Sequence, residues 1–259
     1  MAGQIDIPAS FAGAADVAGK RVVITGAGRG LGRLLAHAFS RSGARVALVA
    51  RTETDLKGVA AELPGPALVL DGDVTDEDFN ESVADTVVAE WGGVDVWICN
   101  AGISPIMGGP RQTDPAVWRE ILDVNLTGAF LGARAAARVM PEGGRVIFTG
   151  SVLGERPRAG LAAYSASKAG LVGLAKGLAL DLASSGITVN VVAPGWFDSP
   201  LAERWKNSPE LEAGVLGHTA QHRWGAATDL AGAYQFLASD ASAFVTGTVI
   251  SVDGGYLLV

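Results

Sequence analysis

The sequence holds only one cysteine, Cys99, in 259 residues, so the chain cannot form an internal disulfide. A single thiol is typical of proteins in a reducing compartment, and the sequence predicts a cytoplasmic location. Long apolar runs are also missing, because none reaches the roughly 20 residues of a membrane-spanning helix. The N-terminus lacks the basic region and apolar core of a signal peptide. We therefore expect no membrane partner.

Positive charge is scarce as well. The chain carries 20 lysines and arginines against 27 aspartates and glutamates, a formal net charge of −7, and it has no basic block. Proteins that bind nucleic acid need a basic surface, so nucleic acid is not expected as a partner. The three histidines, His37, His218 and His222, show no metal-ligand spacing, and the sequence predicts no metal site.

Short apolar segments alternate with helical periodicities along most of the chain. Strands are predicted at residues 21–25, 45–50, 67–70, 94–99, 145–149, 187–192 and near 248–252. Helices are predicted at residues 30–42, 53–63, 76–91, 115–140, 163–184 and near 228–238. This alternation indicates a doubly wound α/β fold of the Rossmann type, with a parallel sheet of about seven strands and helices on both faces.

The predicted domain organisation is simple. One domain is expected over residues 20–259, after an N-terminal extension, residues 1–19, that shows little periodicity. The longest irregular stretch, residues 196–226, follows the sixth strand and is expected to form a lid over the substrate. Open parallel sheets bind ligands beyond the carboxyl ends of their strands, and every motif below falls at such an end.

A glycine-rich turn follows the first strand, with the sequence Thr25-Gly26-Ala27-Gly28-Arg29-Gly30-Leu31-Gly32. The unpaired N–H groups and the positive dipole end of the next helix can bind a pyrophosphate, and glycines let the backbone approach it. The spacing differs from the G-x-G-x-x-G fingerprint, because Leu31 occupies the position of the third glycine. The glycines at 26, 30 and 32 nevertheless predict a dinucleotide site.

The end of the second strand bears on which dinucleotide binds. An acidic residue there would bind the adenosine ribose 2′-hydroxyl and repel a 2′-phosphate, but this chain has Ala50. Arg51 and Thr52 follow, and Arg29 in the glycine turn can reach the same phosphate with its guanidinium group. NADP(H) is therefore the expected cofactor, with NAD(H) as the alternative.

Tyr164 and Lys168 are four residues apart in a predicted helix, so they share one face of it. A tyrosine hydroxyl titrates near about 10, and a neighbouring ammonium group is expected to lower that pKa. The pair can then act as general acid in a reduction and as general base in an oxidation. Ser151, just after the fifth strand, can hydrogen-bond the oxygen of the substrate.

These features, in this order, resemble the short-chain dehydrogenase/reductase family in its small, single-domain form. The resemblance runs from about residue 20 to the end of the chain. Further motifs that carry it are Asp73-Val74, Asn100-Ala101-Gly102, Asn125, Pro194-Gly195 and Asp253-Gly254-Gly255. Two positions depart from the family pattern: Cys99 stands where an asparagine is frequent, and Ser199 stands where a threonine is usual.

The resemblance implies a role for each motif. Lys168 would also bind the nicotinamide ribose, and Asn125 would hold a water that relays protons between the lysine and solvent. Asp73 would contact the adenine. Further cofactor contacts are expected from Leu31, Val74, Asn100, Ala101, Gly102, Pro194, Gly195, Phe197 and Ser199.

Substrate specificity is expected from the aromatic-rich stretch 196–226, in which Trp196, Leu201 and Trp205 are the candidate contacts. Many relatives reduce 3-oxoacyl groups on acyl carrier protein. They resemble this chain but hold the acidic carrier with arginines on two long helices, where this chain has Leu131 and Leu180. A free ketone or alcohol is therefore favoured over a carrier-bound acyl group, and a sugar acid such as gluconate is a further alternative.

Two other function classes fit the sequence less well. A cofactor-sensing or scaffold protein usually lacks part of the catalytic tetrad, which is complete here. Sugar-nucleotide epimerases and dehydratases share the Tyr-x-x-x-Lys pair, but those chains are longer and have a separate substrate domain.

A homodimer or homotetramer is also expected. Helix 163–184 is apolar on nearly every face, and one stripe of helix 115–140 consists of small residues. That stripe is Ala133, Ala135, Ala136 and Ala137.

Overall fold

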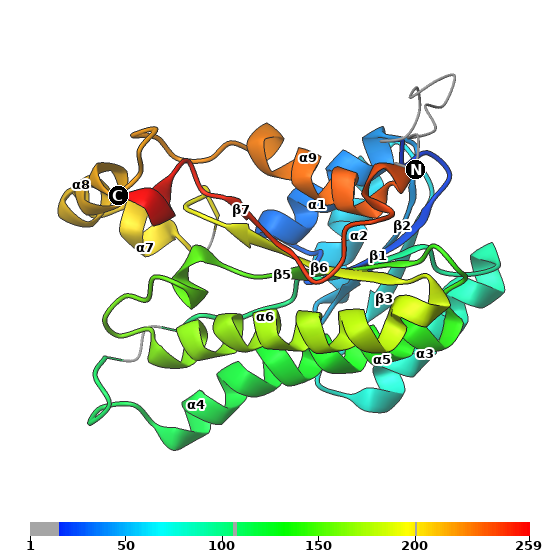
Figure 1. The fold of residues 1–259 in the computed structure, drawn as a ribbon, viewed down its shortest axis with the longest axis horizontal. Coiled ribbons are helices and arrows are strands. Elements are labelled where there is room, and N and C mark those ends of the chain that lie inside the picture. Colours follow the sequence, from blue (N-terminus) through cyan, green and yellow to red (C-terminus); the bar gives the residue numbers. More distant parts are fainter. Residues whose placement is uncertain (1–15, 106–107, 200) are drawn as a thin grey trace, which may run out of the picture.

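The computed structural model describes residues 16–105, 108–199 and 201–259. They form one seven-stranded sheet in which every pairing is parallel and the strands follow the order β3-β2-β1-β4-β5-β6-β7 (Figure 1). The strand order reverses between β1 and β4, where an open parallel sheet offers a crevice at its carboxyl edge. The predicted doubly wound α/β fold is confirmed. The first 15 residues of the predicted extension lie outside the described part.

All predicted strands form, and so does every predicted helix except that over residues 115–140, which forms as two helices. The strands are β1 (Arg21–Thr25), β2 (Arg45–Ala50), β3 (Ala67–Asp71), β4 (Val96–Cys99), β5 (Arg145–Thr149), β6 (Thr188–Pro194) and β7 (Val249–Val252). The helices are α1 (Gly30–Arg41), α2 (Glu53–Glu62), α3 (Glu77–Trp91), α4 (Pro115–Leu122), α5 (Gly128–Val139), α6 (Ala162–Leu182), α7 (Glu203–Lys206), α8 (Pro209–Gly217) and α9 (Ala227–Ala238). Within the described ranges, no helix has both the length and the apolar character needed to cross a bilayer.

Helices cover both faces of the sheet. α1, α2 and α9 lie on one face, and α3, α5 and α6 lie on the other (Figure 1). Each face of the sheet has its own apolar core, and alternate strand residues contribute to one core or the other. Val22 and Ile24 of β1 pack with α1 and α9, whereas Val23 packs on the opposite face. All three side chains are fully buried, as expected of a strand covered on both faces.

Two segments differ from the prediction. The helix predicted over residues 115–140 is interrupted by one π-helical turn, Asp123–Thr127, which separates α4 from α5. The stretch 196–226, predicted to be irregular, contains the helices α7 and α8. Pro209 begins α8 at a position that proline favours, whereas the glycines at 214 and 217 are poor helix formers. These glycines weaken the helical signal of the α8 segment.

The alanine stripe of α5 does not have the expected role. Ala133, Ala135 and Ala136 are at most 1% exposed because they pack in the core of their own chain, so they cannot pair with a second chain. Helix α6 is only partly covered within its own chain. One face of α6 is exposed, and it carries small residues together with Leu180, which is 82% exposed.

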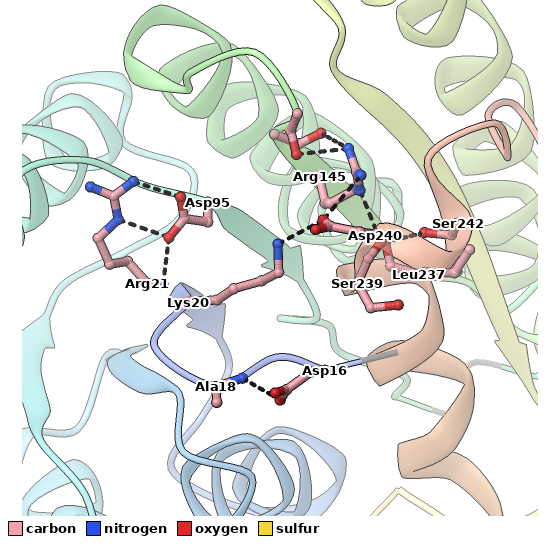
Figure 2. A network of polar contacts seen from close by, with 12 residues as sticks. Asp16, Ala18, Lys20, Arg21, Asp95, Arg145, Leu237, Ser239, Asp240 and Ser242 are labelled. Carbon is pink, nitrogen blue, oxygen red and sulfur yellow. Dashed lines mark hydrogen bonds and ion pairs between the residues drawn. The ribbon is translucent and has the colours of Figure 1, made fainter. Parts of the chain in front are cut away.

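Charged side chains join the strands at the amino edge of the sheet, opposite the crevice (Figure 2). Arg21 of β1 and Asp95, just before β4, form a two-pronged ion pair with an Nη2–Oδ1 distance of 2.6 Å and an Nε–Oδ2 distance of 2.8 Å. The backbone N–H of Arg21 donates to the same carboxylate at 2.8 Å. These bonds join β1 to β4 at the amino edge of the sheet, away from the crevice.

Arg145 extends this network to β5 (Figure 2). Its guanidinium group is almost fully buried and donates to the carbonyl oxygens of Gly143 at 2.7 Å and Gly144 at 3.2 Å. It also lies 3.8 Å from the carboxylate of Asp240, which pairs with Lys20 at 3.2 Å. The start of β5 is therefore tied to the segment that follows α9, and a buried cation is satisfied by backbone carbonyls.

Close packing of α1 against β1 and β4 depends on a glycine at position 32. A Cβ atom on Gly32 would lie 2.1 Å from the carbonyl oxygen of Gly26 and 2.8 Å from Nδ2 of Asn100. Both distances are shorter than any tolerable contact, so the backbone would have to move to admit a side chain. By contrast, a Cβ on Gly58 of α2 would have no atom within 4 Å.

Replacing Gly32 with alanine is expected to lower the free energy of unfolding by about 1–3 kcal/mol, because the methyl group overpacks the turn. Gly58→Ala is the matched control, and it should be at least as stable as the parent because alanine favours a helix by about 1 kcal/mol over glycine. Chemical denaturation followed by circular dichroism measures both variants. Equal denaturation midpoints for Gly32→Ala and the parent protein would contradict this account.

Candidate active site

The carboxyl ends of the strands from β1 to β6 open into one cleft of about 320 Å³. Of the residues that the sequence predicts for the site, all except Asn125 line this cleft. They are Gly26, Arg29, Gly30, Leu31, Gly32, Arg51, Thr52, Asp73, Val74, Asn100, Ala101, Gly102, Ser151, Tyr164, Lys168, Pro194, Gly195, Trp196, Phe197, Ser199, Leu201 and Trp205. Among the described residues, no cluster of three or more His, Cys, Asp or Glu could hold a metal ion.

The glycine turn brings backbone donors to one end of the cleft. Gly26 and Gly30 have φ angles of +68° and +55°, a region that glycine adopts without strain. Arg29 occupies the position before α1 in an extended conformation, and its side chain does not cap the helix. The first-turn N–H groups of a 12-residue helix are therefore left to an external acceptor, so the turn fits a pyrophosphate group.

The side chain of Asn100 holds this turn in position through hydrogen bonds. Its side-chain Nδ2 donates to the carbonyl oxygen of Thr25 at 2.9 Å, and its Oδ1 accepts from the hydroxyl of Thr149 at 3.2 Å. The Thr149 hydroxyl also contacts the Tyr234 hydroxyl at 2.8 Å. The amide of Asn100 is thus occupied within the protein, and Asn100 shapes the cleft by fixing the turn.

The adenosine end of the cleft, at β2 and β3, contains charges of both signs. Arg29 and Arg51 are exposed and line it together with Ala50, the last residue of β2. Asp55, which the sequence analysis missed, also lines it from the first turn of α2. A Cβ on Gly28 would lie 3.0 Å from Cβ of Asp55, so this carboxylate stands directly beside the glycine turn.

Asp73 lies farther along this end of the cleft, just after β3. Its Oδ1 atom accepts hydrogen bonds from the backbone N–H of Thr75 at 2.9 Å and from the Thr75 hydroxyl at 2.8 Å. These bonds fix the side chain at the rim of the cleft. Val74, next to it, is nearly buried.

Ser151 and Tyr164 meet in the middle of the cleft. The hydroxyl oxygen of Ser151 accepts the N–H of Leu153 at 3.1 Å, which leaves its own proton free to donate. Tyr164 of α6 is only 8% exposed. Burial raises the pKa of Tyr164, and the nearby Ser151 hydroxyl offsets only part of this effect.

Lys168 lies one helical turn beyond Tyr164 and is 4% exposed. Its Nζ atom donates to the carbonyl oxygen of Thr149 at 2.8 Å and lies 5.6 Å from the centroid of the Tyr164 ring. Burial lowers the pKa of Lys168 to about 8. Gly102 lies beside the ammonium group, since a Cβ there would be in ordinary contact with Nζ at 3.5 Å.

The expected depression of the Tyr164 pKa by Lys168 is wrong for this structure. Nζ of Lys168 is bonded to the Thr149 carbonyl and lies over the tyrosine ring, and removal of the phenol from water is the larger effect. The raised pKa keeps Tyr164 protonated at neutral pH, which is the form that a general acid requires.

Asn125 lies outside the cleft lining, within the π-helical turn, and is almost fully buried. Its side chain accepts the N–H of Ile103 at 2.8 Å and donates to the carbonyl oxygen of Ile103 at 3.0 Å. It also donates to the hydroxyl of Ser167 on α6 at 3.0 Å. The side chain thus joins the segment after β4 to the helix that carries Tyr164 and Lys168.

The segment after β6 forms the next part of the wall. Gly195 donates its N–H to the carbonyl oxygen of Val252 at 2.9 Å, and a Cβ on it would lie 2.6 Å from Cα of Asp253. β7 therefore holds the Pro194–Gly195 segment in place. Phe197 is buried and pairs with Gly225, and Ser199 follows it on the cleft surface.

Polar lining residues that the sequence analysis missed are Asp55, Ser104 and Thr149. Thr149 could have been predicted from the sequence, because a residue at the carboxyl end of a central parallel strand lies at the ligand-binding edge of the sheet. Asp55 had none, since its place depends on how α2 packs beside Gly28. Together with Ser151, Tyr164 and Lys168, the cleft can hold a carbonyl or hydroxyl oxygen and exchange a proton with it.

Comparison with known proteins agrees with this geometry. A family model described as Enoyl-(Acyl carrier protein) reductase matches residues 26–257. The 3-oxoacyl-[acyl-carrier-protein] reductase FabG of Salmonella typhimurium is 39% identical over 243 residues, which are 93% of this chain and 98% of the relative.

Solved structures extend the comparison. A short-chain type dehydrogenase/reductase from Mycobacterium marinum superposes with a TM-score of 0.88 at 35% identity, covering 95% of this chain and 98% of its own. A candidate NAD(P) dependent gluconate 5-dehydrogenase from Beutenbergia cavernae, with bound NADP, gives a TM-score of 0.87 at 34% identity and 95% and 100% coverage. The chain therefore belongs to the short-chain dehydrogenase/reductase family, and it is an oxidoreductase that acts on CH–OH and C=O groups.

Proposed function

We propose that the protein is an NADP(H)-dependent enzyme that interconverts a free ketone and a secondary alcohol. The observation that carries the proposal is that Ser151, Tyr164 and the buried Lys168 ammonium group, 5.6 Å from the centroid of the Tyr164 ring, line the same cleft as the glycine turn. When bound, the nicotinamide would supply hydride to the carbonyl carbon in reduction and accept it in oxidation.

The chain's own residues would handle the oxygen and the proton. Ser151 donates a hydrogen bond to the substrate oxygen and orients it toward Tyr164. In reduction the Tyr164 hydroxyl gives its proton to that oxygen as the hydride reaches carbon, and in oxidation the phenolate takes the proton back. Lys168 stabilises the phenolate by its charge, and Asn125 keeps the helix in position through Ser167.

The preference for NADP(H) rests on charge at the adenosine end. Ala50 provides no carboxylate at the end of β2, and two guanidinium groups, those of Arg29 and Arg51, line this end of the cleft. Asp55 is the carboxylate beside the glycine turn, and Asp73, farther along, accepts hydrogen bonds from Thr75. This balance favours a 2′-phosphate, because a charge-assisted bond from arginine to phosphate is among the stronger hydrogen bonds. NAD(H) remains the alternative cofactor.

A second candidate is reduction of 3-oxoacyl groups on acyl carrier protein, which the identity to FabG favours. The surfaces of α5 and α6 argue for a free substrate instead. Leu180 is 82% exposed and Leu131 is half-buried, and these apolar residues stand where carrier-binding relatives are expected to have arginines. Apolar side chains cannot hold an acidic protein by charge.

Assembly and location follow from the same proposal. The exposed face of α6 carries the small residues Gly173 and Gly177 together with Leu180, and this composition supports a homodimer or homotetramer. The stretch 196–226 would act as the lid over the substrate. A cytoplasmic location stays a prediction from the single cysteine.

Tyr164→Phe is expected to lower kcat by a factor of about 10²–10⁴, because the ring is kept and only the proton donor is lost. NADPH binding, measured by the change in its fluorescence, should be retained. Tyr256→Phe serves as a control, since this tyrosine packs behind Trp196 and takes no part in the proton transfer. Normal turnover by Tyr164→Phe would refute the mechanism.

The pH dependence of ketone reduction should be set by the ionisation of the Lys168 ammonium group. The reaction needs the protonated phenol, which the raised pKa of Tyr164 preserves, and the ammonium group, which is lost as pH rises through about 8. We expect kcat to be level near neutral pH and to fall above about pH 8.

Lys168→Arg should move that alkaline limit upward, because a guanidinium group stays charged throughout this range. Lys176→Arg, on the exposed side of the same helix, should leave the profile unchanged. Identical alkaline limits in Lys168→Arg and the parent enzyme would show that another group controls the decline.

Cofactor choice can be tested with two substitutions of opposite charge effect. Arg51→Ala should reduce the ratio of kcat/KM for NADPH to kcat/KM for NADH by about tenfold, since one charge-assisted phosphate bond is lost. Asp55→Asn should raise the same ratio because it removes the opposing carboxylate. A ratio that Arg51→Ala leaves unchanged would remove the basis for the proposed preference.

A further inference from the structure

The end of the cleft beyond Ser151 and Tyr164 is walled by apolar side chains. They come from two segments, the loop between β5 and α6 and the stretch that follows β6. The residues concerned are Leu153, Leu161, Trp196, Leu201, Ala202 and Trp205. The two hydroxyl groups that would bind the substrate oxygen thus stand at the mouth of an apolar chamber.

Charged side chains are confined to the other parts of the cleft. Among the described residues, those that line it are Arg29, Arg51, Asp55 and Asp73 at the ends of β1 to β3, and Lys168 behind Tyr164. None belongs to the apolar chamber. The three internal positions outside the described ranges, 106, 107 and 200, are isoleucine, methionine and proline, so they add no charge.

Two arginines lie close to the chamber without lining it. The guanidinium group of Arg158 lies over the rings of Trp196 and Trp205, 5.4 Å and 5.1 Å from their centroids. That of Arg156 lies 5.3 Å from the centroid of the Tyr256 ring and donates to the Tyr256 carbonyl at 2.8 Å. Both cations pack on aromatic faces outside the chamber, and neither lines it.

The aromatic wall is braced from behind. Trp196 packs edge-to-face against Trp205, Trp224 and Tyr256, with centroid separations of 5.1, 6.1 and 6.2 Å. The indole N–H of Trp224 donates to Glu212 of α8 at 2.8 Å, which anchors the cluster to the neighbouring helix. Such interlocked rings keep their shape, so the wall presents a fixed surface to the substrate.

We infer that the substrate is an uncharged alicyclic ketone or the matching secondary alcohol, a hydrocarbon ring that lies against Trp196 and Trp205. This inference rests on the proposed function, because Ser151 and Tyr164 must bind the oxygen of the same molecule. A compact ring loses little conformational freedom on binding and buries apolar area against the tryptophans.

The same wall disfavours the charged alternatives. A carboxylate in the chamber would lose its water and gain no cation, and the faces of aromatic rings are themselves negative. A sugar acid, with several hydroxyl groups and a carboxylate, would leave most of its polar groups without partners. A flexible acyl chain would have to order every rotatable bond on binding. We therefore expect it to be a poorer substrate than the ring ketone.

The test compares ketones that differ in one property, assayed with NADPH as kcat/KM. The probes are 4-methylcyclohexanone, 4-oxocyclohexanecarboxylate, linear 2-heptanone and a 5-oxo sugar acid. We expect 4-methylcyclohexanone to exceed the ring carboxylate by about 100-fold, because burial of an unpaired charge is costly. It should exceed 2-heptanone by about tenfold, because the linear chain must be ordered.

Two variants tie the preference to the wall. Trp205→Ala should lower kcat/KM for 4-methylcyclohexanone by about tenfold while changing that for acetone, which is too small to reach the wall, by less than about threefold. Leu201→Lys places a cation at the rim, where Leu201 is 49% exposed, and should raise kcat/KM for the ring carboxylate by about tenfold. Equal loss with both ketones in Trp205→Ala would indicate general damage and would contradict the inference.

Failure of this inference and failure of the proposed function give different results. If the ring carboxylate, the sugar acid or 2-heptanone equals or exceeds 4-methylcyclohexanone, and Tyr164→Phe abolishes that turnover, the function stands and the inferred substrate class is wrong. If no ketone is turned over although NADPH binds, both the proposed function and the substrate class are wrong.

Discussion

The amide side chain of Asn100 joins three strands at the point where the order of the sheet reverses. It donates to the Thr25 carbonyl of β1 and accepts from the Thr149 hydroxyl of β5, while its own backbone follows β4. The backbone carbonyl of Thr149 then holds the ammonium group of Lys168. The dinucleotide turn and the proton-transfer residues are therefore positioned by one connected set of hydrogen bonds, and a change in one part is transmitted to the other.

The two edges of the sheet have different roles, one in joining the strands and the other in forming the cleft. At the amino edge, ion pairs such as Arg21–Asp95 and the buried guanidinium group of Arg145 fasten the strands to one another and to the segment after α9. At the carboxyl edge, glycines and short loops leave backbone donors and catalytic side chains open to ligands. Parallel strands make this separation possible, because all of their equivalent ends lie on the same side.

The fold and most of the site were predictable because their signals are local. Apolar strand runs alternate with helices, and Tyr164 and Lys168 share a helix face whatever the rest of the chain does. Features that depend on contacts between distant segments were not predictable. The raised pKa of Tyr164 follows from its burial, and the place of Asp55 depends on the packing of α2. The position of Arg158 over the Trp196 ring was also not predictable, because the two residues lie in different segments of the chain.

Burial of Lys168 has a consequence for the whole fold. Its pKa is lowered from 10.5 to about 8 on folding, so between these values the unfolded chain binds a proton that the folded chain does not. The contribution of this residue to stability therefore increases as pH rises through that window, and below it the folded protein confines a charge that water would solvate better. At neutral pH the ammonium group is kept where it destabilises the native state, so the chain carries a buried charge in the cleft at a cost in thermodynamic stability.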